Sequence, residues 1–284
     1  MVLSVEDLRQ HFQVAGLSGT SVCIHASIKS LGQISQGPET VIESALLEDM
    51  SVMVPTQSWK YFSAPKPANR GDISLNAEED GSIPSKLPNN EGFSRESVAV
   101  GAAMGVLPRV LVEKFPHKRG NHPLASFSAT GPRADFLTST QTAERPFAPI
   151  EQLIADKGKI LLLGTDLTSV TALHYAEQLA GLSMLVRWAL ISDGSVQECV
   201  VSGCSLGFEK LSVLLRSIET PYVCGTSNWR IYNAEELVLS ATEIFRQTPT
   251  IGKCDDLTCK RCETRNIFGK STSDSRWLHC RLSS

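Results

Sequence analysis

The chain has 284 residues, of which 42% are hydrophobic and 20% are charged, and its formal net charge is −3. This length fits one large domain or two small ones, and the composition is that of a globular protein with an ordinary apolar core. The weak negative charge argues against a nucleic-acid partner or an anionic membrane surface, and no apolar run is long enough to span a bilayer.

The first residues predict a capped helix. Ser4 occupies the N-cap position and Asp7 the capping-box position, and Leu8 and Phe12 begin an apolar stripe. A secretory signal would instead show a basic start, an apolar block and a small-residue cleavage site. We therefore expect a cytoplasmic protein, in which the eight cysteines are reduced thiols or metal ligands.

Three short apolar runs predict buried parallel strands. They are SVCIHAS at 21–27, SVMVPTQ at 51–57 and KILLLGT at 159–165. Between the first two, GPETVIESALLED predicts a helix with Pro38 at its first position. A strand, helix, strand order is typical of a right-handed crossover in an α/β sheet. We therefore predict an α/β fold, a layered sandwich with a mostly parallel central sheet.

The region that follows the second of these strands has a different composition. Residues 58–97 are rich in Pro, Gly, Asn, Ser and charge, which predicts a long irregular segment that is either functional or disordered. Residues 98–114 then predict a helix that starts near Arg95 and is interrupted at Pro108.

The later part of the chain predicts a hairpin and a helix. An antiparallel hairpin is expected about the turn Asp193-Gly194. A helix is expected after Asn233, which is a favourable cap. We assign 1–250 to a single domain and 251–284 to a cysteine-containing tail.

The loop after the first strand, HASIKSLGQISQGPET, has features of an anion site. Its small residues, among them Ser27, Ser30 and Gly32, would let backbone amides approach a ligand, and Lys29 adds a positive charge. The following helix N-terminus favours anions. The loop fits a diphosphate, although neither the Rossmann nor the P-loop spacing is present, and an ordinary connection remains the alternative.

The stretch GTDLTSVTALHYAEQLAG carries a candidate base. Residues three apart on a helix share a face, so Glu177 would lie beside His174. Imidazole titrates near neutral pH and is the natural proton acceptor. Glu177 would orient the ring or hold a substrate ammonium group, and Asp166 would fill the other role. The alternative is a structural histidine.

The C-terminal tail carries a candidate metal site. Cys254, Cys259 and Cys262 form a C-x₄-C-x₂-C run, with His279 and Cys280 further on. Structural zinc needs four ligands in a tetrahedral array, and here the second pair is loosely spaced, so a structural zinc is one hypothesis. The other cysteines lie in or near strand-like runs and are interpreted as small buried hydrophobes: Cys23, Cys199, Cys204 and Cys224.

Four stretches between Val22 and Gly181 match, in order, the motifs of one family. HASIKSLG followed by GP is similar to a His-Ser-Ser-Leu-x-Ser-Leu-Gly loop, and SVMVPTQS to a Leu-Val-Met-Pro-Thr strand. MGVLPRVLVEKFPHKRGNHPLASFSATGPRADFL resembles a Met-Gly helix followed by Arg-Ser-x-His-Pro and Ser-Phe-x-Ala-x-Gly. KILLLGTDLTSVTALHYAEQLAG resembles a Leu-Leu-Leu-Gly strand and a Thr-Ser-Leu-His-Leu-Ala-Glu helix, and CKRCE a terminal Cys-x-x-Cys of some members. The chain thus resembles the aminoglycoside 3-N-acetyltransferases, antibiotic-resistance enzymes that move acetyl from acetyl-CoA to an amine.

The resemblance implies an α/β sandwich and direct acetyl transfer in a ternary complex, with His174 as general base and Glu177 nearby. The antibiotic would sit in an acidic cleft, because carboxylates attract a polycation, and Asp72, Glu79 and Glu91 of the long loop are the candidates. A homodimer is a further hypothesis. The candidate acetyl-CoA contacts are His25, Ser27, Ile28, Lys29, Ser30, Leu31 and Gly32, with Arg119 and His122 from the later turn.

The chain also departs from the family pattern. Gly92-Phe93-Ser94 stands where the family has Phe-Asp-Pro, so an acidic substrate contact is missing, and Arg109 replaces a glutamate. These changes affect the acceptor side more than the coenzyme side. Two alternatives therefore stay open: the same chemistry on an amine of a different small metabolite, and a non-catalytic scaffold that binds coenzyme A or zinc.

Overall fold

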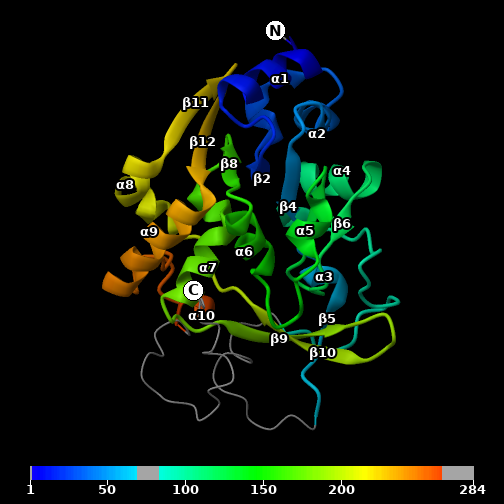
Figure 1. Cartoon of the computed structure of the whole chain (residues 1–284). Coiled ribbons are helices and arrows are strands. Elements are labelled where there is room, and N and C mark those ends of the chain that lie inside the picture. The colour runs from blue at the N-terminus through cyan, green and yellow to red at the C-terminus, as the bar shows by residue number, and fades with distance from the viewer. Residues whose placement is uncertain (1, 69–82, 264–284) are drawn as a thin grey trace.

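A seven-stranded sheet runs through the molecule in the order β11-β12-β8-β2-β4-β7-β6 (Figure 1). The computed structural model describes residues 2–68 and 83–263. The strands of this sheet are β2 (Ser21–Ala26), β4 (Ser51–Pro55), β6 (Lys118–Arg119), β7 (Phe127–Thr130), β8 (Lys159–Leu163), β11 (Thr220–Cys224) and β12 (Ser227–Asn233).

Only the centre of the sheet is parallel. β2 pairs in parallel with β4 on one side and with β8 on the other. β7 and β12 join these strands antiparallel, and β6 and β11 extend the two edges antiparallel again. The α/β class and the parallel core are confirmed, whereas the expectation of a mostly parallel sheet is wrong. The apolar pattern of a strand reports its burial and not the direction of its neighbour.

Helices cover both faces of the sheet. Along β2, Val22 and Ile24 join the core on one face, and Cys23 joins the core on the other. Both faces of the strand are therefore apolar, which explains its continuous hydrophobic run. The first face carries α1 (Val5–Val14), α2 (Glu39–Leu46) and α4 (Val106–Lys114); the second carries α5 (Ala134–Thr138), α6 (Ala148–Ala155), α7 (Thr171–Leu179) and α9 (Ala234–Gln247).

The predicted helix caps are present. The Ser4 hydroxyl accepts a hydrogen bond from the Asp7 amide at 3.1 Å, and the Asp7 carboxylate accepts one from the Ser4 amide at 2.8 Å. At α9 the Asn233 side chain accepts from the Glu236 amide at 3.1 Å. Each bond satisfies a donor that the first turn of a helix leaves unpaired.

The helix predicted at 98–114 is shorter than expected. A short 3₁₀ turn, η2 (Ala102–Met104), precedes α4, which begins at Val106. Pro108 is the third residue of α4 and does not interrupt it. A proline in the first turn removes an amide that has no intrahelical partner, so it is tolerated there.

A smaller three-stranded sheet lies at one end of the molecule (Figure 1). The predicted hairpin about Asp193-Gly194 forms two of its strands, and Gly194 adopts φ +83° in the turn. The third strand and a short helix come from the region predicted to be irregular. The strands of this sheet are β5 (Ser63–Ala64), β9 (Leu185–Leu190) and β10 (Val196–Val201), and the short helix is α3 (Trp59–Phe62).

The remaining short elements lie outside both sheets. β1 (Val2–Leu3) and β3 (Gln33–Ile34) pair with each other, and α8 (Ser212–Leu215) and α10 (Lys260–Glu263) are single helical turns.

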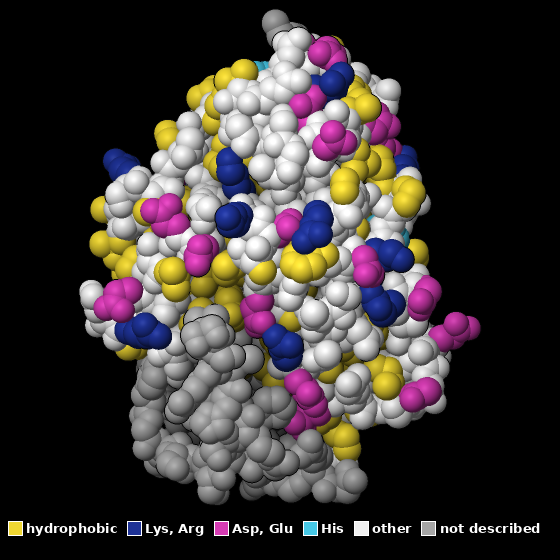
Figure 2. Space-filling model, in the orientation of Figure 1, with side chains coloured by type: hydrophobic (Ala, Val, Ile, Leu, Met, Phe, Trp, Pro, Cys, Tyr) yellow, Lys and Arg dark blue, Asp and Glu magenta, His cyan; other side chains and the backbone are white. Residues whose placement is uncertain are grey.

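Charged side chains of both signs are interspersed on the face of the molecule shown in Figure 2. This distribution agrees with the small net charge of −3. Within residues 2–68 and 83–263, none of the helices combines the length and the apolar character that crossing a bilayer requires.

Candidate active site

A cavity of about 1090 Å³ opens at the carboxyl ends of the parallel strands. Its walls include His25 and Ala26 of β2, Pro55 of β4 and Thr165 just after β8. The chain proceeds from β2 to β4 on one side, while β8 joins β2 on the other. Open α/β sheets bind ligands at such a reversal of strand order, outside the carboxyl ends of the strands. The volume lies just above the range of about 300–1,000 Å³ that is usual for drug-sized pockets.

His174 borders this cavity from α7. Its Nδ1 lies 2.7 Å from Oε2 of Glu177, one turn later on the same helix. A carboxylate accepts a hydrogen bond, so Nδ1 carries the proton and Nε2 is left as a proton acceptor. His174 is 5% exposed and Glu177 is 1% exposed, so the pair is shielded from water and the ring is held in one orientation.

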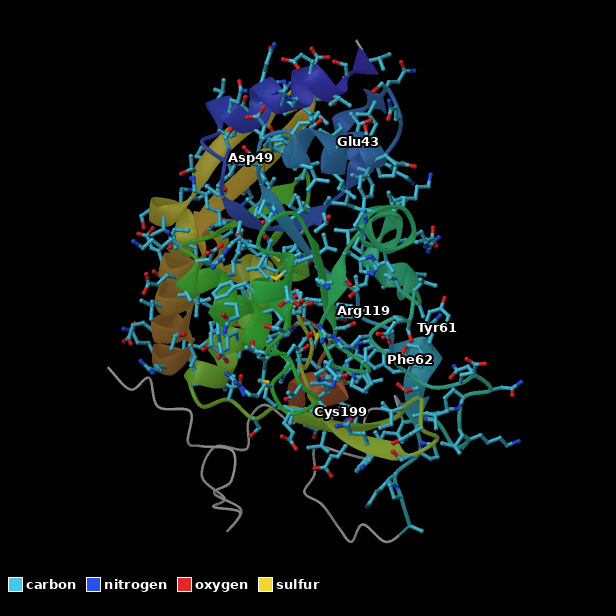
Figure 3. All side chains as sticks on the ribbon, turned by 45° about the vertical axis from the view of Figure 1, so that its right-hand side comes forward. Glu43, Asp49, Tyr61, Phe62, Arg119 and Cys199 are labelled. Carbon is cyan, nitrogen blue, oxygen red and sulfur yellow. The ribbon has the colours of Figure 1, made fainter. Side chains whose placement is uncertain are left out.

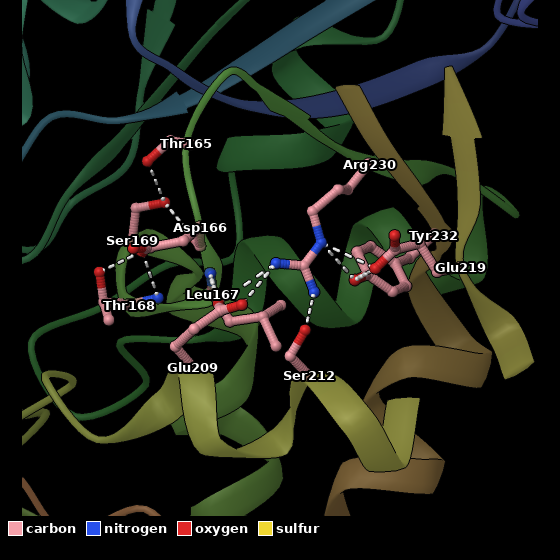
Figure 4. Close-up of polar contacts among 10 residues, drawn as sticks. All are labelled: Thr165, Asp166, Leu167, Thr168, Ser169, Glu209, Ser212, Glu219, Arg230 and Tyr232. Atoms are coloured by element: carbon pink, nitrogen blue, oxygen red, sulfur yellow. Dashed lines mark hydrogen bonds and ion pairs between the residues drawn. The ribbon is translucent and has the colours of Figure 1, made fainter. Parts of the chain in front are cut away.

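Asp166 is not part of this pair. It is exposed and caps a 3₁₀ turn, η3 (Leu167–Ser169), where its carboxylate accepts from the amide of Thr168 at 3.0 Å and from the hydroxyl of the same residue (Figure 4). It is also absent from the described residues that border the cavity. In the structure, Glu177 is therefore the carboxylate bonded to His174, and Asp166 is a cap.

A polar network fixes the segment that packs against His174 (Figure 4). Glu209 accepts from the amide of Leu167 at 2.8 Å and from Nη1 of Arg230 at 3.0 Å, and Nε of Arg230 also donates to Glu219 at 2.7 Å. Next to Glu209, the ring of Phe208 lies 4.7 Å from that of His174, centroid to centroid. These partners are distant in sequence, so no local pattern predicts their contacts.

The predicted coenzyme loop mostly folds back on the sheet. The amide of Ser27 donates to the Leu163 carbonyl at 2.9 Å, and the Ser30 and Ser227 hydroxyls lie 2.7 Å apart. A Cβ on Gly164 would come within 1.9 Å of the Ser30 oxygen, which explains the glycine after β8. Six predicted coenzyme contacts are therefore not among the described residues that border the cavity: Ser27, Ile28, Lys29, Ser30, Leu31 and Gly32.

His25 is the predicted loop residue that does border the cavity. Burial lowers its pKa from 6.5 to about 4, so the ring is neutral at neutral pH. A neutral imidazole cannot pair with a phosphate as a cation, which limits His25 to hydrogen bonding or shape.

His122 is fully buried and structural. Its Nδ1 accepts from the amides of Leu124 at 3.2 Å and Ala125 at 2.9 Å, and its Nε2 donates to the carbonyl of Val200 at 2.8 Å. Burial lowers its pKa to about 4. Both ring nitrogens are thus bonded inside the protein, which does not support the predicted coenzyme contact.

Arg119 is likewise internal, with 1% exposure. Figure 3 shows it in the middle of the molecule, above Phe62 and the small sheet. Its Nε donates to the Ser126 hydroxyl at 3.0 Å, and its Nη2 donates to the carbonyls of Thr56 at 2.9 Å and Ala99 at 2.8 Å. The guanidinium holds the segment before α4 against the sheet, so the prediction that it reaches a coenzyme phosphate is not supported.

The charged residues that border the cavity are mainly basic. They include Lys60, Lys86, Arg187 and Arg261, and the described lining contains no Asp or Glu. Among the predicted acceptor carboxylates, Glu91 is exposed and is not part of this lining, while Asp72 and Glu79 lie outside the described residues. The described part of the chain therefore does not form the acidic cleft that was expected.

The tail cysteines meet a fourth cysteine. The sulfur atoms of Cys204, Cys254, Cys259 and Cys262 all lie within 4.8 Å of one another. Cys204 follows β10 and borders the cavity, so its interpretation as a simple buried hydrophobe is incomplete. Cys204 and Cys254 are 50 residues apart, and no local sequence pattern predicts that they lie together. His279 and Cys280 lie outside the described residues.

Comparison with known proteins identifies the family. A sequence model described as aminoglycoside 3-N-acetyltransferase matches residues 23–246, most of the chain. The chain belongs to this family. Aminoglycoside N(3)-acetyltransferase III of a Salmonella species is 32% identical over 170 residues, which are 58% of this chain and 56% of that protein. The chain thus matches little more than half the length of this curated relative.

Solved structures show the same fold. The apoenzyme of aminoglycoside acetyltransferase AAC(3)-IVa superposes with a TM-score of 0.72 at 19% identity, over 93% of this chain and 97% of that one. AAC-IIIb in a binary complex with CoASH gives a TM-score of 0.68 at 19% identity, over 87% and 97% of the two chains.

The burial of His122 predicts a pH-dependent stability. Its folded pKa is about 4 and its unfolded value about 6.5, so the unfolded chain takes up the proton first as the pH falls. The stabilisation is complete above pH 6.5 and is lost between 6.5 and 4, by about 2 kcal/mol at pH 5. His122→Gln should reduce the fall in the free energy of unfolding between about pH 7.5 and 5, measured by urea unfolding. The control is His117→Gln, at a partly exposed position; an equal fall in wild type and His122→Gln would contradict the prediction.

The Arg119 network predicts a large loss of stability on truncation. Arg119→Met removes the Arg119 hydrogen bonds to the carbonyls of Ser97 and Ala99, so the free energy of unfolding should fall by about 3 kcal/mol. The adjacent exposed residue gives the control, Lys118→Met, which should change it by less than about 0.5 kcal/mol. Urea unfolding measures both, and similar values for the two variants would refute a structural role for Arg119.

Proposed function

We propose that this protein transfers the acetyl group of acetyl-CoA to the 3-amino group of an aminoglycoside, with His174 as general base while both substrates are bound. The family supports acetyl transfer, and the complex of AAC-IIIb with CoASH supports coenzyme A as the donor. The observation that carries the proposal is the His174 ring, held at the cavity wall with Nδ1 bonded to Glu177.

The pair supplies what an amine needs to attack a thioester. An ammonium group has no lone pair, so a base must take its proton, and Nε2 of His174 is left to accept it. Glu177 then stabilises the imidazolium that forms. The neutral nitrogen forms its bond to the acetyl carbon and the carbon–sulfur bond breaks. The departing thiolate takes the proton held by the imidazolium, and the acylated nitrogen releases its remaining extra proton to solvent, which leaves a neutral amide and CoASH.

The first turn of α7 supports the same chemistry. Val170 and Thr171 border the cavity, and Val170 caps the helix without a side-chain hydrogen bond. The helix dipole and the first-turn amides favour negative charge at this end. They suit the carbonyl oxygen of the thioester, which gains negative charge when the amine attacks.

The basic side chains at the cavity favour binding of the proposed donor, acetyl-CoA, more than binding of a polycationic acceptor. Lys60, Lys86 and Arg261 are exposed at the cavity and suit the phosphates of coenzyme A. The same charges repel a polycation. In addition, the segment Gly92-Phe93-Ser94 lacks the acid of the family's Phe-Asp-Pro, and Phe93 is buried. A second candidate function follows from this observation: acetylation of an amine that also bears negative charge, such as an amino sugar linked to a nucleotide.

His174→Ala should lower kcat by about 10²- to 10⁴-fold, because no other group replaces the proton acceptor. Glu177→Gln, whose amide oxygen still accepts from Nδ1 but carries no charge, should lower kcat by about 10-fold or more with little change in KM for acetyl-CoA. The measurement is initial-rate kinetics of CoASH release, with a thiol reagent as the reporter.

His117→Ala provides the matched control, because this histidine is outside the cavity lining and contacts the Phe115 carbonyl. Circular dichroism should show that all three variants are folded. Normal turnover in folded His174→Ala would reject its role as base, and coenzyme A binding without turnover in the wild type would favour the scaffold alternative.

A panel of amines separates the two acceptor classes. If the basic lining selects the acceptor, amino sugars that carry a phosphate should give a kcat/KM at least about 10-fold above that of polycationic aminoglycosides. Charge reversal, Lys86→Glu, should shift this ratio toward the polycations. Efficient acetylation of aminoglycosides at low ionic strength, unaffected by Lys86→Glu, would exclude the second candidate.

A further inference from the structure

Four thiols from two distant segments converge beside the cavity. Cys204 belongs to the segment after β10, and Cys254, Cys259 and Cys262 to the segment after α9. Their sulfur atoms lie within 4.8 Å of one another, and Cys254 and Cys262 are 3.5 Å apart. Thiolates around one tetrahedral zinc lie about 3.8 Å apart, from a Zn–S distance of about 2.3 Å. The spacing therefore fits a single ion at the centre of the four.

Local turns already place the tail thiols. The amide of Cys262 donates to the carbonyl of Cys259 at 2.9 Å, which closes the turn between these two residues. The carboxylate of Asp256 accepts from the amide of Thr258 at 2.9 Å and so fixes the loop that leads back to Cys254. The amide of Cys254 donates to the Cys262 sulfur at 3.4 Å. Such amide–sulfur bonds stabilise a thiolate, the form that binds metal.

A metal explains the cluster better than a disulfide does. A disulfide joins two sulfurs at about 2.05 Å and would leave the other two thiols unexplained. Here all four are mutually close, and two of them, Cys204 and Cys262, are buried. Lys253 and Arg261 adjoin two of the ligands in sequence, and their positive charges are of the sign that favours four thiolates around a divalent ion.

We propose that Cys204, Cys254, Cys259 and Cys262 bind one structural Zn²⁺, which ties the C-terminal segment to the wall of the active-site cavity. Four sulfur ligands leave no open position, so the ion is structural and not catalytic. The inference goes beyond the proposed function, because zinc binding can be measured whether or not acetyl transfer occurs.

Cys204 links the proposed zinc site to the wall of the active-site cavity. Cys204 borders the cavity, and four residues later Phe208 packs against His174. Between them Gly207 lies so close to the tail that an added Cβ would be 2.1 Å from the Lys253 carbonyl oxygen. The zinc thus fixes one end of a short wall segment, 204–208, whose other end is held by the Glu209 contacts.

Metal analysis of the full chain purified without chelator is the first test. We expect one zinc per chain by plasma mass spectrometry. Cobalt substitution should give the intense visible bands of a tetrahedral tetrathiolate site. Cys204→Ser and Cys259→Ser should each lose most of the zinc, and Cys224→Ser, at a buried cysteine outside the cluster, should keep it.

A measurement on the wild type removes the dependence on variant folding. A mercurial that titrates the thiols should release one zinc into a chromophoric chelator, in step with modification of four cysteines. Zinc absent from protein whose thiols are reduced, iron in its place, a disulfide among the four, or full zinc in folded Cys204→Ser would each overturn the proposal.

Hydrogen exchange tests the link to the cavity wall without an activity assay. Removal of zinc should increase amide exchange in 203–211 and in the tail segment 252–263, and leave α1 unchanged. Zinc that leaves without changing exchange in 203–211 would overturn the wall-fixing part of the proposal.

Discussion

The parallel pairing of β2 with β4 and β8 is the constraint on which the rest of the site depends. Three strands that run the same way end at one edge of the sheet, and every loop or helix that follows them starts there. The cavity, the first turn of α7 and His25 all lie at that edge. The antiparallel strands outside this core extend the sheet without moving the edge.

The second layer of organisation is a set of contacts that hold the groups near His174. Glu177 fixes the ring from within α7, and Phe208 packs on its face. Glu209 and Arg230 anchor the segment that carries Phe208, and the four-cysteine cluster lies at the other end of that segment. An imidazole can act as a base only while its orientation is fixed, so these contacts are the ones that the proposed role of His174 requires.

Among the described residues, the charged side chains that border the cavity are basic, which differs from the acidic cleft that the family resemblance implies. The fold and the His–Glu pair suit acetyl transfer, while Lys60, Lys86 and Arg261 suit an anionic partner. Acetyl-CoA, the proposed donor, brings such anions. The acceptor then has to bind beside these charges, which makes cavity electrostatics the property that determines the choice of amine.

The sequence by itself determined the elements whose signals are local: the capped helix at Ser4, the three buried strands, the hairpin at Gly194, and the pairing of His174 with Glu177 three residues apart. Periodicity, turn chemistry and helix geometry act over a few residues, so they can be read along the chain. Tertiary structure alone decided strand direction at the sheet edges, the burial of Arg119 and His122, and the meeting of Cys204 with Cys254. Those outcomes depend on which distant segments pack together, and the type of a residue and its sequence neighbours do not specify such long-range contacts.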